Sequence, residues 1–273
     1  MNKKRPPSSG RPPRHTPADD ARWADLRRLT AARIGLKRTG ASLATGPLLD
    51  FQLAHARARD AVHEPLDAAR LAADFAAELA ELAAPVLTVA SAAPDRQRYL
   101  MRPDLGRQLA PGAEAVLAPH TGRSDIVFVV VDGLSARAVA AHARPVLARV
   151  LPALRAEGWR IGPLVIVCQG RVAVGDAIAT ALGAGCVAVL IGERPGLTAP
   201  DSMGAYLTWQ PGPQTTDADR NCISNIRPEG IGYADAAFKL VHLLRAMRMR
   251  GRSGVALKDD SERLRLDRSF GDS

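Results

Sequence analysis

Residues 126–131 read Ile-Val-Phe-Val-Val-Val, an unbroken apolar run of β-branched and aromatic side chains. Such a run is typical of a strand covered on both faces, as the strands of a parallel sheet are. Asp132-Gly133-Leu134-Ser135 follows as a turn, and residues Ala136 to Glu157 predict an amphipathic helix, interrupted near Pro145 and Pro152. The segment therefore predicts the first strand and helix of a layered α/β domain.

The same alternation continues toward the C-terminus. Buried strands are predicted at Leu164–Cys168 and Cys186–Ile191, with a helix at Val174–Leu182 between them and a last amphipathic helix at Ala234–Met249. Strand, helix, strand, helix, strand is a βαβαβ layout, for which right-handed crossovers are expected. We therefore expect residues 85–250 to form a Rossmann-like parallel sheet with flanking helices.

The segment before this layout changes its pattern at Pro85. Residues Val86–Ala90 predict a short strand, and Tyr99-Leu100-Met101 a further one. Residues Pro103 to Leu109 resemble a helix with proline in its first turn. These elements are expected to belong to the same domain.

Residues 19–84 predict a helical N-terminal subdomain. Its first helix is expected to carry four apolar side chains on one face: Trp23, Leu26, Leu29 and Ile34. The second helix is expected to run from Pro47 to Val62, and the third from Ala68 to Ala84.

Both ends of the chain have the composition of tails. Residues 1–18 are rich in proline, serine and basic side chains and cannot form a core, so disorder is expected. Residues 251–273 are charged and are expected to form a flexible C-terminal tail. No signal peptide is visible at the charged N-terminus, and no apolar run has the length of a membrane span.

The net charge of +9 invites a nucleic-acid interpretation, which its distribution weakens. Five of the cations lie in the tail of residues 1–18, and elsewhere arginines alternate with acids. Aromatic residues are only 4% of the chain, so no platform for base stacking is evident. The three cysteines are well separated and the six histidines lack metal-ligand spacing, which indicates a reducing compartment without structural disulfides or a metal site.

Ligands of open parallel sheets bind beyond the carboxyl ends of the strands. Three segments follow the predicted strands: 132–135, Gln169-Gly170-Arg171-Val172, and 192–197 (Gly-Glu-Arg-Pro-Gly-Leu). Their glycines, carboxylates and arginines suggest a ligand with polar and hydrophobic contacts. No G-x-G-x-x-G, P-loop or G-x-S-x-G motif is present, so usual dinucleotide, nucleotide and hydrolase signatures are missing.

Each of these residues also has an ordinary structural interpretation. Asp132 and Ser135 are explained by turn chemistry and helix N-capping. Glu193 and Arg194 can form a solvated ion pair. Cys222 can be a buried thiol beside a turn capped by its neighbours Asp219 and Arg220. The residue pattern thus predicts an α/β ligand-binding domain without identifying the ligand.

Six segments in a fixed order carry a family resemblance. They are Thr30–Ile34 (T-A-A-R-I), Tyr99–Arg107 (Y-L-M-R-P-D-L-G-R), Val131–Ser135 (V-D-G-L-S), Gly170–Val172 (G-R-V), Gly192–Leu197 (G-E-R-P-G-L) and Asp219–Ile226 (D-R-N-C-I-S-N-I). Together the chain resembles the small, or light, subunit of ethanolamine ammonia-lyase. The last two segments are the most specific, and the resemblance extends over most of residues 22–250.

The resemblance implies an adenosylcobalamin-dependent enzyme that converts ethanolamine to acetaldehyde and ammonia by a radical mechanism. It implies a large TIM-barrel subunit as partner, a higher hetero-oligomer, and a cobalamin site between the two subunits. This chain would supply cofactor contacts through Val172, Glu193 and Cys222, with no catalytic residue or metal ligand of its own. Arg171 and Arg194 are candidates for the cofactor phosphate.

Two further implications concern the cofactor and the location. The D-x-H-x-x-G motif of proteins that replace the cofactor's lower ligand is absent, which agrees with the family's base-on mode. Family members have N-terminal extensions that can direct packaging, which implies a cytoplasmic enzyme within a bacterial microcompartment. Residues 1–18 contain no amphipathic helix, so entry through the partner is the alternative.

Two other hypotheses compete with the lyase subunit. One is a free-standing Rossmann-like nucleotide-binding protein, which the binding of NAD or ATP by the isolated chain would favour. The other is an assembly protein whose basic tail binds acidic surfaces, which loss of association on deletion of residues 1–18 would favour. No nucleic acid or membrane partner is expected.

Overall fold

The computed structural model describes residues 17–30, 32–79 and 85–262, and the contacts divide the chain into two units, 1–56 and 57–273. Within the first unit lie α1 (Pro17–Arg27), the antiparallel pair β1 (Arg38–Thr39) and β2 (Ser42–Leu43), and the start of α2 (Thr45–His63). Because α1 ends at Arg27, the expected helical face does not extend to Leu29 and Ile34, and that prediction is wrong.

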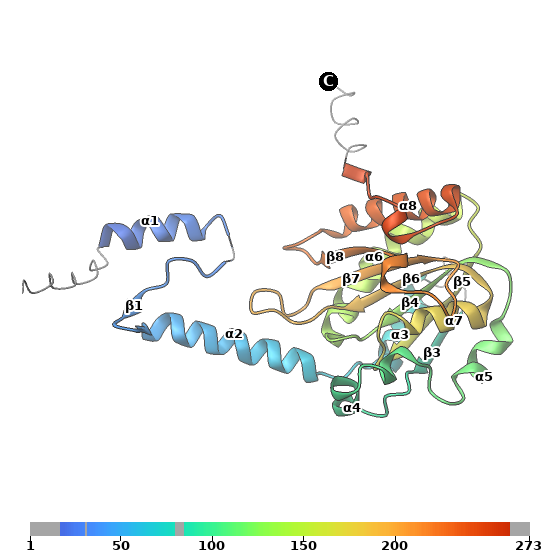
Figure 1. The fold of residues 1–273 in the computed structure, drawn as a ribbon, viewed down its shortest axis with the longest axis horizontal. Coiled ribbons are helices and arrows are strands. Elements are labelled where there is room, and N and C mark those ends of the chain that lie inside the picture. Colours follow the sequence, from blue (N-terminus) through green and yellow to red (C-terminus); the bar gives the residue numbers. More distant parts are fainter. Residues whose placement is uncertain (1–16, 31, 80–84, 263–273) are drawn as a thin grey trace, which may run out of the picture. The chain divides into compact units, whose positions relative to one another are not determined.

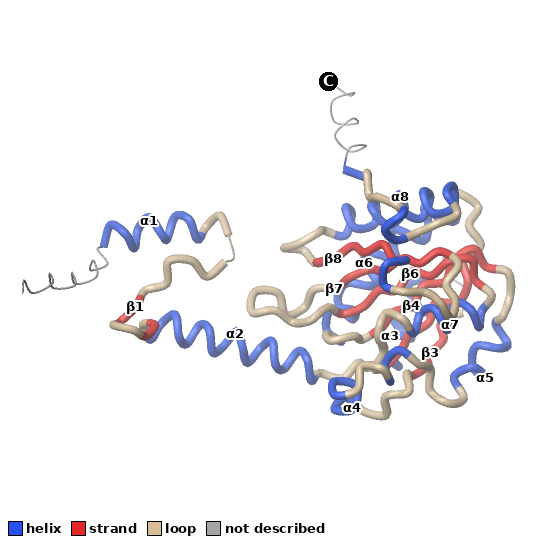
Figure 2. Tube along the Cα trace, in the orientation of Figure 1, coloured by secondary structure: helices blue, strands red, loops and turns tan. Residues whose placement is uncertain are grey.

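The second unit is built on one six-stranded sheet in the order β3-β5-β4-β6-β7-β8 (Figures 1 and 2). Strands β3 (Val86–Ala90), β5 (Ile161–Cys168), β4 (Ser124–Val131) and β6 (Ala184–Gly192) are parallel. Strands β7 (Met203–Trp209) and β8 (Arg220–Ile226) continue the sheet antiparallel. The α/β class is confirmed, whereas a wholly parallel sheet is corrected to a mixed one.

Helices cover both faces of this sheet. One apolar cluster joins strand residues such as Phe128 and Ile166 to α3 (Ala68–Leu79), α6 (Ala136–Ala156) and α8 (Tyr233–Arg250). A second joins alternate strand residues such as Val129 and Val165 to α5 (Ala113–Leu117) and α7 (Val174–Leu182). Alternating strand residues therefore point to two cores, which explains the unbroken apolar runs.

The structure does not clearly show the expected N-terminal helical subdomain. Leu71 and Phe75 of α3 are buried in the core beneath the sheet, and the division between the units falls at Ala56/Arg57, inside α2. The structure therefore does not show residues 19–84 as a separate body, and residues 80–84 of the third expected helix lie outside the described residues.

Three local predictions are corrected. Tyr99-Leu100-Met101 belongs to helix α4 (Arg96–Met101), begun by Asp95, whose carboxylate accepts the Arg98 backbone N–H, and is not a strand. Helix α6 runs through Pro145 and Pro152 without a break. The segment expected as a helix at 103–109 contains one short 3-10 helix, η1 (Leu105–Arg107).

The C-terminal segment is held against the sheet as far as it is described. A one-turn helix, η4 (Gly254–Ala256), precedes Leu257, which is buried. The Asn221 side-chain amide of β8 donates to the backbone oxygens of Gly254 and Leu257. Residues 263–273 of the expected flexible tail, like residues 1–16 of the N-terminal tail, lie outside the described residues. No described helix combines the length and apolarity required to cross a bilayer.

Candidate functional site

A cavity of about 370 Å³ lies at the carboxyl edge of the parallel strands. The loops after β4, β5 and β6 line it, together with Tyr99 of α4 and Tyr206 of β7. Its position follows from the register, because Val131 of β4 aligns with Val167 of β5 and with Ile191 of β6. The three strands thus end together, as the sequence predicted.

Two glycines bring the first and third loops into backbone contact. Gly133 has φ of +55°, and a Cβ there would lie 2.3 Å from the Gly192 carbonyl oxygen. A Cβ on Gly192 would in turn lie 2.0 Å from the Ser135 carbonyl oxygen. The Leu134 N–H donates to the Gly192 oxygen at 2.9 Å. Side chains at either glycine would force the cavity walls apart.

Asp132 joins the first and second loops. Its buried carboxylate accepts the backbone N–H groups of Gln169 (2.9 Å) and Gly170 (3.1 Å), and the Arg96 guanidinium lies 3.6 Å away. These contacts hold Gln169 at φ of +56°, a region that non-glycine residues rarely adopt. Burial raises the pKa of Asp132, against the opposing effect of these donors. The turn interpretation of Asp132 was therefore incomplete, while Ser135 does cap α6 by accepting the N–H of Ala138.

Tyr99 of α4 lines the cavity next to the second loop. Its side chain is fully buried, and its hydroxyl donates to the Gly170 carbonyl at 3.1 Å. Guanidinium groups lie over the ring, Arg96 at 4.8 Å and Arg171 at 4.3 Å from its centroid. Burial raises the pKa of Tyr99, so the phenol stays neutral.

Val172 and Glu193, two of the three predicted contacts, line this one cavity. Val172 is half-buried and packs against the α7-side core. Glu193 is also half-buried, and its carboxylate accepts the Asn225 N–H at 3.1 Å from Oε2 and 3.3 Å from Oε1. A Cβ on Gly204 would lie 3.0 Å from Glu193 Oε1, so the missing side chain leaves room for the carboxylate.

Cys222, the third predicted contact, lies on β8 directly opposite Tyr206 of β7. Its thiol is exposed and lies 3.2 Å from the Ser224 hydroxyl, so the interpretation as a buried thiol is wrong. Burial raises the pKa of Tyr206, with further contributions from the Cys222 thiol and the Glu193 carboxylate. Cys222 does not line the cavity itself, but its neighbour Tyr206 does.

The neighbours of Cys222 have separate roles. The Asp219 carboxylate accepts the Thr216 N–H at 2.8 Å, which confirms the predicted turn cap. Arg220 also caps this turn, as predicted, because its backbone N–H donates to the Asp217 carbonyl oxygen. In addition, its buried guanidinium donates to both carboxylate oxygens of Asp176 on α7, at 2.8 and 2.7 Å, and to the Thr208 hydroxyl. This ion pair fixes β8 against α7.

Sequence reasoning missed Tyr99 and Tyr206 as site residues. Both lie in segments whose structure was mispredicted or not predicted, the helix α4 and the strand β7. The one available signal was their rarity, since the chain has only three tyrosines. An isolated tyrosine in such a segment needs a partner for its hydroxyl and is a reasonable site candidate.

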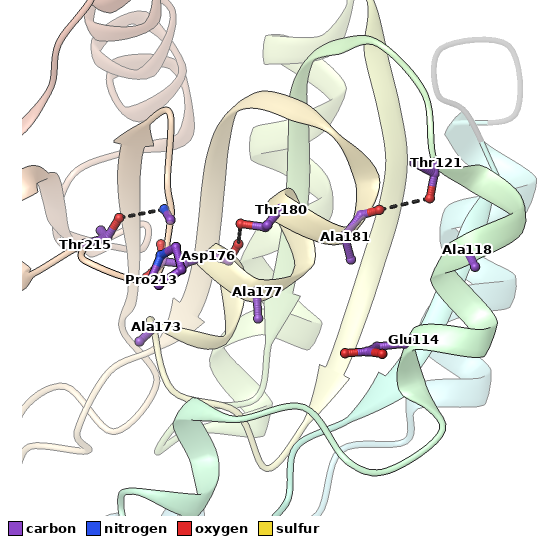
Figure 3. A pocket seen from close by; sticks show the side chains of 11 residues that line it. Glu114, Ala118, Thr121, Ala173, Asp176, Ala177, Thr180, Ala181, Pro213 and Thr215 are labelled. Carbon is purple, nitrogen blue, oxygen red and sulfur yellow. Dashed lines mark hydrogen bonds between the residues drawn. The ribbon is translucent and has the colours of Figure 1, made fainter.

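A second cavity, of about 630 Å³, lies along the outer side of α7 (Figure 3). Ala173, Ala177 and Ala181 line it opposite Glu114 and the loop containing Pro213. Most of its polar side chains already bond to protein: Thr121 to the Ala181 oxygen, Thr180 to the Asp176 oxygen, and Asp176 to Arg220. None of the three predicted contact residues lines this larger cavity.

The comparisons with known proteins concern nearly the whole chain. Residues 20–258 match the family model described as ethanolamine ammonia-lyase light chain (EutC). The chain is 54% identical over 244 residues to the ethanolamine ammonia-lyase small subunit of Ralstonia nicotianae, covering 88% of this chain and 89% of the relative. It is 52% identical over 256 residues to the small subunit of Azotobacter vinelandii, covering 92% and 93%.

Proposed function

Because the chain belongs to the ethanolamine ammonia-lyase light-chain family and is the small subunit of this carbon–nitrogen lyase, we propose that its strand-end cavity is one wall of an adenosylcobalamin site. A small subunit implies a large one. In this proposal the large subunit, a TIM barrel, supplies the opposite wall and the groups that act on ethanolamine.

The observation that carries the proposal is that Val172 and Glu193 line one open cavity at the carboxyl edge of the sheet. About 370 Å³ lies at the small end of the range for pockets that enclose drug-sized ligands. A corrinoid is considerably larger, so this surface fits only one side of it. That size supports a shared site at a subunit interface.

The polar groups of the cavity fit the periphery of such a cofactor. Val172 provides an apolar contact for the corrin edge or the nucleotide loop. Glu193 retains acceptor capacity beyond the Asn225 N–H, since an ionised carboxylate has about four lone-pair sites, and accepts from corrin amides or nucleotide hydroxyls. Cys222 is a small polarisable contact on the adjoining strand, with no role as a cobalt ligand or nucleophile.

Bound adenosylcobalamin supplies the radical chemistry of the reaction. The residues of this chain bind and orient it. The Asp132 carboxylate and the paired glycines Gly133 and Gly192 hold the binding loops in place, and the Arg220–Asp176 ion pair holds β8 beside them.

The proposal is tested by Glu193→Ala in the complex co-expressed with the large subunit. Loss of one charge-assisted hydrogen bond predicts adenosylcobalamin binding weaker by about 1.5–3 kcal/mol, roughly a 10- to 100-fold rise in Kd. Equilibrium dialysis measures this directly. Glu114→Ala, which removes an exposed carboxylate from the second cavity, is the matched control and should leave Kd unchanged.

Undiminished affinity in Glu193→Ala would contradict the role of Glu193. The lyase activity itself is checked by ethanolamine-dependent acetaldehyde formation of the co-expressed pair, with and without adenosylcobalamin. Formation of acetaldehyde without the cofactor would contradict the cobalamin site as a whole.

The proposal extends to the assembly. We infer a higher hetero-oligomer of small and large subunits that is packaged in a bacterial microcompartment, with entry through the partner as one route. Native mass of the co-expressed complex, and fractionation of cells carrying the full chain or a chain without residues 1–18, test these two statements. A one-to-one heterodimer, or absence from isolated microcompartments, would contradict them.

A further inference from the structure

Arg171 is a guanidinium group held in a defined place in the strand-end cavity. It follows β5, and its backbone N–H donates to the Gly106 carbonyl at 2.7 Å. Its charged end lies 4.3 Å from the centroid of the buried Tyr99 ring. A Cβ on Gly106 would lie 2.8 Å from Arg171 Cγ, so the glycine makes room for the arginine stem.

Three more deeply buried guanidinium groups lie near carboxylates, whereas the half-buried Arg171 does not. Arg96 lies 3.6 Å from Asp132, Arg220 2.7 Å from Asp176, and Arg227 3.3 Å from Asp201. Within residues 17–30, 32–79 and 85–262, no carboxylate lies within 4.0 Å of the Arg171 guanidinium. Its Nε is buried and has no hydrogen-bond partner there.

Burying part of a guanidinium without an anionic partner is unfavourable, and an anionic ligand at the half-buried Arg171 would reduce this penalty. The planar guanidinium, already oriented on the Tyr99 ring, matches the two oxygens of a phosphate group. Because Arg171 lines the same cavity as Val172 and Glu193, such an anion would lie within the proposed cofactor site.

We propose that Arg171 is a further cofactor-binding residue that recognises the phosphate of the nucleotide loop. This inference rests on the proposed function. The amide side chains of the corrin are neutral, whereas the phosphodiester carries a full negative charge. Arg171 and Glu193 then divide the recognition: the cation binds the phosphate, and the carboxylate accepts from amide or hydroxyl donors. The site distinguishes phosphate-bearing corrinoids from phosphate-free ones.

The experiment uses two probes that differ by the phosphate, adenosylcobinamide phosphate and adenosylcobinamide. Their Kd values are measured by equilibrium dialysis against the co-expressed complex. The wild-type complex should bind the phosphate-bearing probe roughly tenfold more tightly or better, as expected for a charge-assisted contact. Arg171→Met, which keeps the apolar stem, should lose most of this preference while binding adenosylcobinamide as before, and Arg171→Lys should retain part of it.

Arg123→Met is the matched control, because Arg123 is exposed and precedes β4 at the opposite edge of the sheet. It should keep the preference of the wild type. Equal weakening of both probes in Arg171→Met would show a structural role and overturn the inference, as would an unchanged preference. Failure of both probes and of adenosylcobalamin to bind the wild-type complex would instead contradict the proposed function on which the inference rests.

Discussion

The sheet has a parallel half, β3, β5, β4 and β6, and an antiparallel half, β7 and β8, and the central strand β4 of the first half is covered differently from the edge strand β8 of the second. The last six residues of β4 are buried without interruption. Along β8 only three of the seven residues are buried, at intervals of three positions. The parallel half is thus a platform between two layers of helices, whereas β8 at the edge of the sheet leaves side chains such as Cys222 exposed.

The proposed site lies where the two halves meet. Val172 follows a strand of the parallel half, Glu193 follows β6 at the point of reversal, and Cys222 belongs to the antiparallel half. In the parallel half, the loops after the strands carry the site residues, and backbone contacts hold these loops in position. In the antiparallel half, the site residue lies on the strand itself. The comparison predicts that changes in the two halves have different consequences for stability.

The largest effect is expected from Phe128→Ala in the parallel half. Phe128 is 1% exposed between β4 and the covering helices, so the truncation leaves a cavity in the core. We expect the free energy of unfolding of the full chain to fall by about 3–5 kcal/mol. Chemical denaturation followed by the fluorescence of Trp159 and Trp209 measures it. Val255→Ala, 83% exposed, is the control and should change the value by less than about 0.5 kcal/mol.

A somewhat smaller effect is expected from Arg220→Met in the antiparallel half. The substitution leaves the Asp176 carboxylate without its bidentate partner, at a cost of about 3 kcal/mol in the same denaturation experiment. Arg160→Met also removes an arginine from a carboxylate, Asp125, but that arginine is 60% exposed and the expected loss is at most about 1 kcal/mol. Equal losses in the free energy of unfolding of the two variants would contradict the expected difference between a buried and an exposed ion pair.

The smallest effect concerns pH and the helices that cover the antiparallel half. Burial lowers the pKa of His142 on α6 below its ordinary value of 6.5, against the opposing effects of Asp201 and Glu229. Its Nδ1 lies 2.9 Å from the Tyr233 hydroxyl. The folded state therefore favours the neutral ring, so this contribution to stability is present above pH 6.5 and is lost as the pH falls below it.

The check is the free energy of unfolding between pH 7.5 and 5.5 for the wild type and His142→Gln. We expect the wild type to lose more stability than the variant over this interval, because the glutamine has no proton to gain. Parallel pH dependences would show that His142 does not titrate between the folded and unfolded states.

The parallel half could be predicted from sequence, and the antiparallel half could not. Strands β4, β5 and β6 contain continuous apolar runs rich in β-branched residues, and α7 was predicted with its observed bounds. Strand β7 contains Gly204, Tyr206 and Thr208, and β8 mixes polar with apolar side chains without regular alternation. Short strands of this composition resemble loops until pairing with a neighbour stabilises them.

The site residues differ in the same way in how far the sequence predicted them. The segments that contain Val172 and Glu193 followed from the rule that ligands bind at the carboxyl ends of parallel strands, the two residues themselves came from the family resemblance, and the structure brings them to one cavity. Cys222 came only from the family resemblance, because its strand was not predicted. The contacts of Asp132 with Gln169 and Gly170 could not be predicted either, since they join loops 37 and 38 residues apart in the chain.

The Asp132 carboxylate has a consequence for how the cofactor binds. The loop it binds loses its conformational freedom when the chain folds, so a later ligand meets a surface that needs no further ordering. In the proposed site, the cofactor would therefore meet a loop that Asp132 already holds in place. Replacing Asp132 with asparagine would turn one of these acceptors into a donor and make the loop conformation dependent on the bound cofactor.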